Sequence, residues 1–236
     1  MPRTIVTIPT YNEAENIAAL IAELRKLDLE VLVADDHSPD GTWRMVQELA
    51  AKDDKIHLLD RQSKRGRGYA GAEAFTLALK MGADYIVEMD ADFSHQPKYI
   101  PEFLKALAAG ADLAVGSRLV TGGRDQGRAW YRVWLTRFSA WYARTVLGMS
   151  LRDINSGFRA FSRAAMEAIN PSTLISAGPS IVHEVYARAK ALRLKIVEVP
   201  ITFIERERGA SALTVSRLLD GFRKVWQVRR TTKSVK

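Results

Sequence analysis

The chain has 236 residues, 47% of them hydrophobic and 26% charged, a composition that fits a folded domain and excludes a disordered chain. It contains no cysteine, which excludes disulfides and thiolate metal sites, and no apolar run approaches the ~18 residues of a membrane-spanning helix. The net charge of +8 is unevenly placed: residues 1–117 carry −6, residues 118–163 carry +7, and residues 217–236 carry +6. Such asymmetry indicates an anionic partner, which would be a nucleic acid, a membrane surface or a phosphorylated substrate.

The first 117 residues alternate between strand and helix patterns. Strands are expected at residues 4–8, 30–34, 56–59, 85–89 and 112–116. Asn12, with Glu15 three residues later, predicts the capped start of the first helix, and the turn at residues 38–41 predicts the start of the second. Further helices are expected at residues 69–81 and 98–108. This alternation is typical of βαβ units around a parallel sheet.

The pattern changes after residue 117. We expect a helix at residues 130–147, an extended or looped segment at 153–162, a helix at 181–191, a strand at 195–203 and a helix at 214–228. No interdomain linker is visible, and residues 1–3 lead directly into a strand, so no signal peptide is expected. We predict one α/β domain over residues 1–212, followed by a basic amphipathic helix and tail over residues 213–236.

Carboxylates follow two of the predicted strands. In open parallel sheets, ligands bind beyond the carboxyl ends of the strands. Asp90 and Asp92 would lie on one side if the strand continued, where they could hold Mg²⁺ or Mn²⁺ or merely cap a loop. Asp35 and Asp36 could accept hydrogen bonds from a nucleoside or form the following turn. Neither glycine-rich phosphate motif is present, which argues against a dinucleotide enzyme and a P-loop enzyme.

Five motifs together resemble those of inverting family 2 glycosyltransferases. They are residues 8–13 (IPTYNE), 35–42 (DDHSPDGT), 88–92 (EMDAD), 153–159 (DINSGFR) and 199–203 (VPITF). Within that family the sequence is most similar to the dolichol-phosphate (polyprenol-phosphate) mannose synthases, through residues 93–97, 116–118 and 205–209. The resemblance spans residues 4–211. It implies a GT-A fold, a Rossmann-like α/β domain with a mostly parallel central sheet that binds a nucleotide sugar and a divalent metal.

The resemblance also implies roles for individual residues. Nucleotide-sugar binding is implied for Pro9, Tyr11, Glu13, Ala34, Asp36, Asp90, Ala91, Asp92, Arg118 and Arg206. Mg²⁺ or Mn²⁺ would be held by Asp90, Asp92 and Ser94, and the acceptor phosphate by Arg118, Arg132 and Thr136. The implied catalytic residues are Asp92, Arg118 and Arg132.

The sequence departs from the family pattern in two places. The Arg-Gly motif usually ends in Ser-Lys, but here Ala212 stands where the lysine would help to hold the diphosphate. The aromatic-Gln-x-Glu segment is replaced by residues 181–184, in which we expect His183 and Glu184 to be structural. The identity of the donor and the geometry of the acceptor therefore stay open.

The implied reaction transfers mannose from GDP-mannose to a polyprenyl phosphate. A phosphate monoester is largely dianionic at neutral pH, so it needs positioning and charge neutralisation rather than a general base. Guanidinium groups match phosphate oxygens bidentately. We therefore expect Arg118, Arg132 and Arg159 to be the phosphate-binding members of the nine arginines at residues 118–163.

Several tryptophans lie in the two basic segments. Trp130, Trp134 and Trp141 belong to the first, and Trp226 to the second. Tryptophan beside arginine and lysine on an amphipathic helix is typical of a membrane interface, although such rings can also fill a core. We expect a cytoplasmic protein peripherally associated with the cytoplasmic face of a membrane, where a small membrane partner subunit could join it.

Other functions fit parts of the sequence. A polyprenyl-phosphate glucosyltransferase, or another family 2 glycosyltransferase, would use a UDP-sugar as donor. Ala212 would also suit a non-catalytic nucleotide-sugar-binding protein. A basic nucleic-acid-binding protein is disfavoured, because no such motif is present and the positive charge follows an acidic α/β half.

Overall fold

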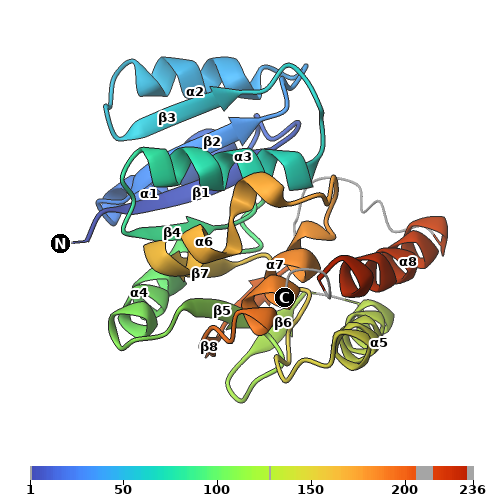
Figure 1. Ribbon diagram of the computed structural model, residues 1–236. Helices are drawn as coiled ribbons and strands as arrows, with labels where there is room; N and C mark the ends of the chain where they lie inside the picture. Colours follow the sequence, from blue (N-terminus) through green and yellow to red (C-terminus); the bar gives the residue numbers. More distant parts are fainter. Residues whose placement is uncertain (1, 128, 206–214, 233–236) are drawn as a thin grey trace.

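The computed structural model describes residues 2–127, 129–205 and 215–232, and it is a central β-sheet with helices on both faces (Figure 1). The seven-stranded sheet has the order β3-β2-β1-β4-β7-β5-β8. Its strands are β1 (Thr4–Thr10), β2 (Glu30–Asp35), β3 (Ile56–Asp60), β4 (Tyr85–Glu88), β5 (Leu113–Ser117), β7 (Arg159–Ser162) and β8 (Ile196–Pro200). All neighbours pair in parallel except β7, which is antiparallel to β4 and β5. The predicted α/β fold with a mostly parallel sheet is confirmed.

A second, two-stranded sheet pairs β6 (Arg124–Gln126) with β9 (Thr202–Ile204). The helices are α1 (Ile17–Lys26), α2 (Thr42–Ala50), α3 (Arg67–Lys80), α4 (Ile100–Ala108), α5 (Trp130–Leu147), α6 (Arg163–Ile169), α7 (Ile181–Ala191) and α8 (Val215–Thr232), with short 3₁₀ turns η1 (Pro97–Tyr99) and η2 (Pro171–Thr173). Within the described residues, no helix combines the length and hydropathy that crossing a bilayer requires.

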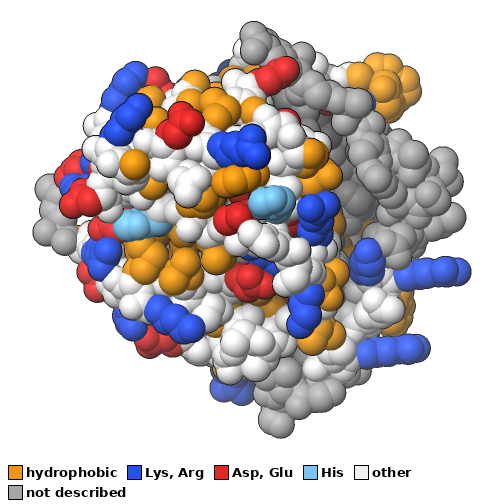
Figure 2. All heavy atoms as spheres, turned by 90° about the horizontal axis from the view of Figure 1, so that it is seen from above, with side chains coloured by type: hydrophobic (Ala, Val, Ile, Leu, Met, Phe, Trp, Pro, Cys, Tyr) orange, Lys and Arg blue, Asp and Glu red, His pale blue; other side chains and the backbone are white. Residues whose placement is uncertain are grey.

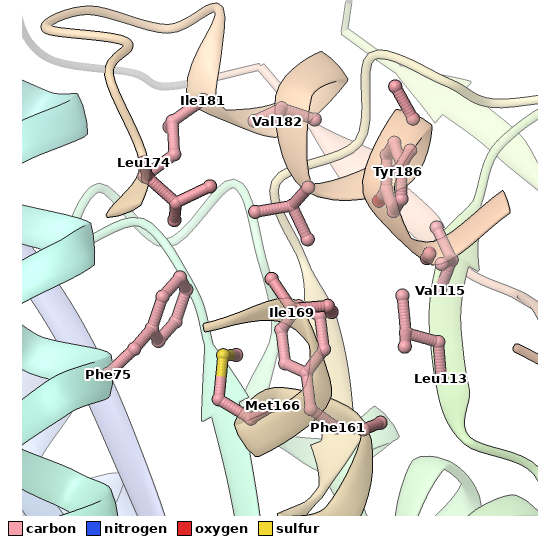
Figure 3. Close-up of a cluster of buried hydrophobic side chains, with 14 of the residues drawn as sticks. Phe75, Leu113, Val115, Phe161, Met166, Ile169, Leu174, Ile181, Val182 and Tyr186 are labelled. Carbon is pink, nitrogen blue, oxygen red and sulfur yellow. The ribbon is translucent and has the colours of Figure 1, made fainter. Parts of the chain in front are cut away.

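Two apolar clusters hold the helices to the sheet. Successive residues of β1 point to opposite faces, so Ile5 joins one cluster while Val6 joins the other. The first cluster packs α3, α6 and α7 on one face, where Phe75 meets the edge of Phe161 at a centroid distance of 5.6 Å (Figure 3). The second cluster packs α1, α2 and α4 on the other face.

Helices α5 and α8 lie side by side at the opposite end of the sheet from β3 (Figure 1). Ala140 and Ala143 of α5, with Val225 and Val228 of α8, are buried in the first cluster. The C-terminal helix is thus packed on the α/β domain, while the predicted boundary at residue 212 lies outside the described residues.

On the face that carries α2 and β3, acidic and basic side chains are mixed (Figure 2).

Several local predictions were wrong. The first helix begins at Ile17 rather than after Asn12, because Asn12 has φ 59°, outside the helical region, and residues 14–16 form a turn. The N–H groups of Asn12 and Glu13 donate to Ser38 Oγ and Thr42 Oγ1 instead. The expected strand at residues 195–203 is divided between β8 and β9, and β6 and α6 were not anticipated. Strand β4 ends at Glu88, so the carboxylates that follow are not placed by strand geometry.

Candidate functional site

The carboxyl ends of β1, β2 and β4 meet at one edge of the sheet. There they enclose a pocket of about 220 Å³. The predicted donor-site residues that line it are Pro9, Tyr11, Glu13, Asp36, Asp90, Ala91 and Asp92. Thr10, Arg67 and Ala70 complete the lining. The structure therefore brings most of the predicted nucleotide-sugar site together.

Asp35 connects the chain segments at the ends of β1 and β2. Its side chain is fully buried and accepts hydrogen bonds from Thr10 Oγ1 at 2.7 Å, from the Ser38 N–H at 2.7 Å and from Ser38 Oγ at 2.8 Å. Since Thr10 is the last residue of β1 and Ser38 follows β2, Asp35 ties the end of β1 to the loop after β2. Asp35 is structural, whereas its neighbour Asp36 lines the pocket.

Asp36 is held by a buried arginine. Arg61 donates to Asp36 Oδ1, and the Gly66 N–H donates to Asp36 Oδ2 at 2.6 Å. Arg61 also donates to both oxygens of Glu73 at 3.0 Å. Burial by itself would lower the pKa of Arg61, but Glu73 and Asp36 outweigh it and raise that pKa. The Asp36 carboxylate is therefore fixed in orientation at the pocket wall.

Asp90 and Asp92 provide two carboxylates to the same pocket. Asp92 Oδ1 accepts hydrogen bonds from Ser94 Oγ at 2.6 Å and from the Ser94 N–H at 3.1 Å. Asp90 Oδ1 accepts one from Arg67 Nη2 at 2.9 Å. Among the described residues, no group of three or more histidine or acidic side chains is arranged to hold a metal ion. Any cation here would take its remaining ligands from water or substrate, which is how Mg²⁺ is usually bound.

His95 is buried and holds the backbone of Asp90. Its Nδ1 accepts the Asp90 N–H at 3.1 Å, so the neutral ring carries its proton on Nε2. Burial lowers the pKa of His95 and keeps the ring neutral. The imidazole stacks on Phe158 at a centroid distance of 5.0 Å, and Phe203 meets its edge at 5.8 Å.

The predicted acceptor residues lie outside the lining of this pocket. Arg118 donates hydrogen bonds to Asp153 from Nε at 2.7 Å and from Nη2 at 2.8 Å. Its guanidinium lies 4.9 Å from the centre of the Phe203 ring. Arg132, on α5, is ion-paired with Glu205, and Thr136 follows it by one helical turn. Since Phe203 also touches His95, it connects Arg118 with the Asp90 side of the pocket.

Other predicted residues are placed differently. Ala34 is buried in β2 opposite Pro9, and Ser94 is buried beside Asp92. Arg206 and Ala212 lie outside the described residues. The expectation that Arg159 binds phosphate was wrong: Arg159 is fully buried, and its Nε donates to Glu88 Oε2 at 2.6 Å.

Sequence reasoning missed Arg67, the first residue of α3. Its side chain is 23% exposed and reaches both Asp90 Oδ1 at 2.9 Å and Glu88 Oε1 at 3.6 Å. Burial would lower the pKa of Arg67, but the charges of Asp90 and Glu88 raise it above its usual value. The one available signal was its position in a Gly-Arg-Gly sequence at a helix start, which does not identify a partner.

His183 and Glu184 are structural in this fold. His183 Nε2 is hydrogen-bonded to Asn155 Oδ1 at 2.9 Å. Glu184 accepts the backbone N–H groups of Ile175 and Ser176 and pairs with Arg188. Neither contact includes the pocket.

The buried His183 should make the free energy of unfolding fall in acid. Burial, together with the charge of Arg159, lowers the pKa of His183 to about 4. In the unfolded chain a histidine titrates near ~6.5, so between these values the unfolded state binds more protons. The free energy of unfolding should fall as the pH drops from ~6.5, by at most ~1.4 kcal/mol per pH unit from this residue. Urea unfolding at several pH values should show that the free energy of unfolding of His183→Gln depends less steeply on pH than that of the wild type. An unchanged pH dependence would refute this role of His183.

Comparison with known proteins identifies the family. The family model "Glycosyl transferase family 2" matches residues 5–169. The polyprenol monophosphomannose synthase of Mycolicibacterium smegmatis is 41% identical over 232 residues, which are 96% of this chain and 88% of that protein. The undecaprenyl-phosphate mannosyltransferase of Micrococcus luteus is 40% identical over 214 residues, 90% of this chain and 88% of that protein.

A solved structure supports the fold. The glucosyl-3-phosphoglycerate synthase of Mycobacterium tuberculosis, crystallised with Mn²⁺, UDP and glucosyl-3-phosphoglycerate, matches with a TM-score of 0.69. The match covers 98% of this chain and 80% of that one at 20% sequence identity. The predicted GT-A fold is therefore confirmed. With residues 5–169 matching the family model, this chain belongs to glycosyltransferase family 2.

Proposed function

We propose that this protein transfers mannose from GDP-mannose to the phosphate of a polyprenyl lipid, with inversion at the anomeric carbon and with the help of a divalent cation. The observation that carries the proposal is the 41% identity to a polyprenol monophosphomannose synthase over 96% of the chain. A second relative, 40% identical, is also named for mannose transfer to a polyprenyl phosphate.

The pocket offers chemistry that suits the donor. Tyr11 is exposed at its rim and offers a ring on which a base can stack, while Asp36 offers acceptor oxygens to a nucleoside. Asp90 and Asp92 are hard oxygen ligands that fit Mg²⁺ or Mn²⁺ when the diphosphate and water supply the rest. We propose that Ser94 orients Asp92 by donating a hydrogen bond to its carboxylate, and that it also contacts the cation. When bound, the cation would stabilise the charge of the departing diphosphate.

The arginines beyond the pocket suit the acceptor. Arg118, aligned by Asp153, would face the lipid phosphate together with Arg132 and Thr136. An arriving phosphate would compete with Glu205 for Arg132, since both are anions. A dianionic phosphate needs no general base, so these residues orient an oxygen for in-line attack on the sugar. For Arg206, which lies outside the described residues, nucleotide-sugar binding remains the role that the family resemblance implies.

A donor panel tests this function. Labelled GDP-mannose, UDP-glucose and UDP-N-acetylglucosamine would each be incubated with a polyprenyl phosphate and Mg²⁺ or Mn²⁺. We expect lipid-soluble label from GDP-mannose alone. Lipid-soluble label from a UDP-sugar instead would show that the donor is that UDP-sugar and not GDP-mannose. Metal-dependent donor binding without any transfer would indicate a non-catalytic relative.

We further propose that α5 and α8 form the face that meets the membrane. The tryptophans of α5 are unusually exposed for such large rings: Trp130 by 81%, Trp134 by 64% and Trp141 by 58%. Phe138 stacks on Trp134 at 5.7 Å and lies 5.8 Å from Trp141, so these three rings form an aromatic stripe on α5, which also carries several arginines. We propose residues 1–212 as the catalytic domain and residues 213–236 as the basic segment of this face, on the cytoplasmic side of a membrane.

Removing part of the aromatic stripe should weaken membrane binding. Liposomes containing anionic lipid should pellet the Trp134→Ser/Trp141→Ser variant about tenfold less strongly than the wild type, because two apolar rings no longer enter the interface. Leu27→Ser removes an exposed apolar side chain after α1 and is the matched control. Equal binding of the double variant and the control would exclude α5 as the docking surface.

A further inference from the structure

Four side chains of alternating charge lead from the core to the pocket. Fully buried Arg159 donates to Glu88 Oε2 at 2.6 Å, and Glu88 Oε1 lies 3.6 Å from Arg67 Nη1. Arg67 Nη2 then donates to Asp90 Oδ1 at 2.9 Å. We call this series Arg159, Glu88, Arg67 and Asp90 the charge ladder. Its last member is one of the two carboxylates proposed to hold the cation.

Three glycines set the position of Arg67. A Cβ at Gly68 would lie 1.8 Å from the carbonyl oxygen of Ser176, and one at Gly66 would lie 2.4 Å from that of Ala177. The start of α3 therefore packs directly on that backbone, where the Gly68 N–H donates to the Ala177 carbonyl at 2.9 Å. Opposite, a Cβ at Gly157 would lie 2.7 Å from Arg67 Nη2. The guanidinium thus occupies a space shaped for it between Asp90 and residue 157.

This position has an electrostatic consequence for cation binding. In the free protein Arg67 already supplies a positive charge to Asp90 at hydrogen-bond distance. A divalent ion on the same carboxylate would have to share Asp90 with Arg67 and would be repelled by it over a few ångströms. An anionic diphosphate would relieve that repulsion, because it interacts favourably with both cations.

We propose that Arg67 is a positioning residue that neutralises Asp90 in the free enzyme and weakens its hold on a divalent cation, so that the cation binds tightly only together with an anionic donor. The inference rests on the proposed function, which places the cation at Asp90 and Asp92. It predicts that metal and nucleotide bind cooperatively and that Arg67 is one source of the cooperativity.

The test measures Mn²⁺ binding to the intact protein without nucleotide, using the paramagnetic resonance signal of free Mn²⁺. We expect Arg67→Met to lower the dissociation constant of Mn²⁺ about tenfold, because the competing charge is gone. Arg67→Gln removes the charge but keeps a hydrogen-bond donor, and it should show the same direction of change. Arg67→Lys keeps the charge and should stay near the wild-type value.

The matched control is Arg163→Met. Arg163 is also the first residue of a helix, α6, but it pairs with exposed Glu167 and does not line the pocket. It should leave Mn²⁺ binding unchanged. Thermal unfolding of each variant would show that it is folded before its binding is compared.

Adding GDP supplies the second readout. GDP should tighten Mn²⁺ binding to the wild type more than to Arg67→Met. Unchanged or weaker Mn²⁺ binding by both neutral variants, or equal tightening by GDP in wild type and Arg67→Met, would overturn the role of Arg67. By contrast, if Mn²⁺ binding survives Asp90→Asn and Asp92→Asn, or is absent throughout even with GDP, the metal site of the proposed function fails instead.

Discussion

Replacing Asp92 with asparagine should lower kcat/KM for mannose transfer roughly a hundred- to a thousandfold, the usual effect of losing one group that stabilises transition-state charge. Asparagine keeps the size of the side chain and the oxygen that accepts from Ser94 at 2.6 Å, so the loop should keep its shape. What is lost is one negative charge in the pocket where the proposed cation neutralises the leaving diphosphate.

The measurement is the initial rate of lipid-linked mannose formation at several donor concentrations. Asp60→Asn is a matched control, because Asp60 is likewise an aspartate at the carboxyl edge of the sheet, as the last residue of β3, but it pairs with His37 and does not line the pocket. That control should keep its rate within about twofold, as expected for a surface substitution away from the site. Full activity of Asp92→Asn would remove this carboxylate from the mechanism.

Replacing Arg159 with methionine should lower the free energy of unfolding by about 3–5 kcal/mol. Arg159 and Glu88 are both fully buried, and β4 and β7 place them directly opposite each other. Methionine fills part of the volume but leaves the Glu88 carboxylate without its closest cation, at 2.6 Å. A buried charge that loses its closest partner costs far more than a lost surface ion pair.

Urea unfolding of the two variants would measure this difference. In the control, Lys26→Met, the ion pair with Glu23 spans one turn of α1 on the surface. Its loss should cost less than about 1 kcal/mol. If Arg159→Met were no more destabilising than Lys26→Met, the charge ladder would contribute little to the fold.

The part of the site that lies at strand ends was accessible from the sequence. Parallel strands end at a common edge, so motifs after β1, β2 and β4 had to meet there, and Pro9, Asp36 and Asp92 do line one pocket. This held even though β4 stops at Glu88, because the pocket depends on where the strands end rather than on continued strand alternation.

The placement of Arg159 could not be predicted from the sequence, because it depends on the direction of strand β7. A run of four residues, Arg159–Ser162, carries no sign of its direction, and only the antiparallel pairing places Arg159 opposite Glu88 in the core. From the sequence alone, Arg159 therefore cannot be distinguished from the other arginines of the basic segment. Arg67 was missed for a related reason, since its partners follow it by more than 20 residues and are reached only through the packing of α3.

The charge pattern was informative about the partner class but not about individual residues. Of the arginines in the basic segment, Arg118 is tied to Asp153, Arg132 to Glu205 and Arg159 to Glu88. Net charge sums over groups that are already paired in the fold, so it reflects the field of the segment rather than free cations.

In the proposed reaction, the sugar is transferred directly to a lipid phosphate in a single displacement. This transfer is tested most directly by the anomeric configuration of the product formed from GDP-mannose and a polyprenyl phosphate, determined by NMR spectroscopy. A mannosyl-phosphate lipid whose anomeric configuration is opposite to that of the donor is the expected product. A lipid product with retained configuration, or free mannose as the only sugar product, would contradict the proposed reaction.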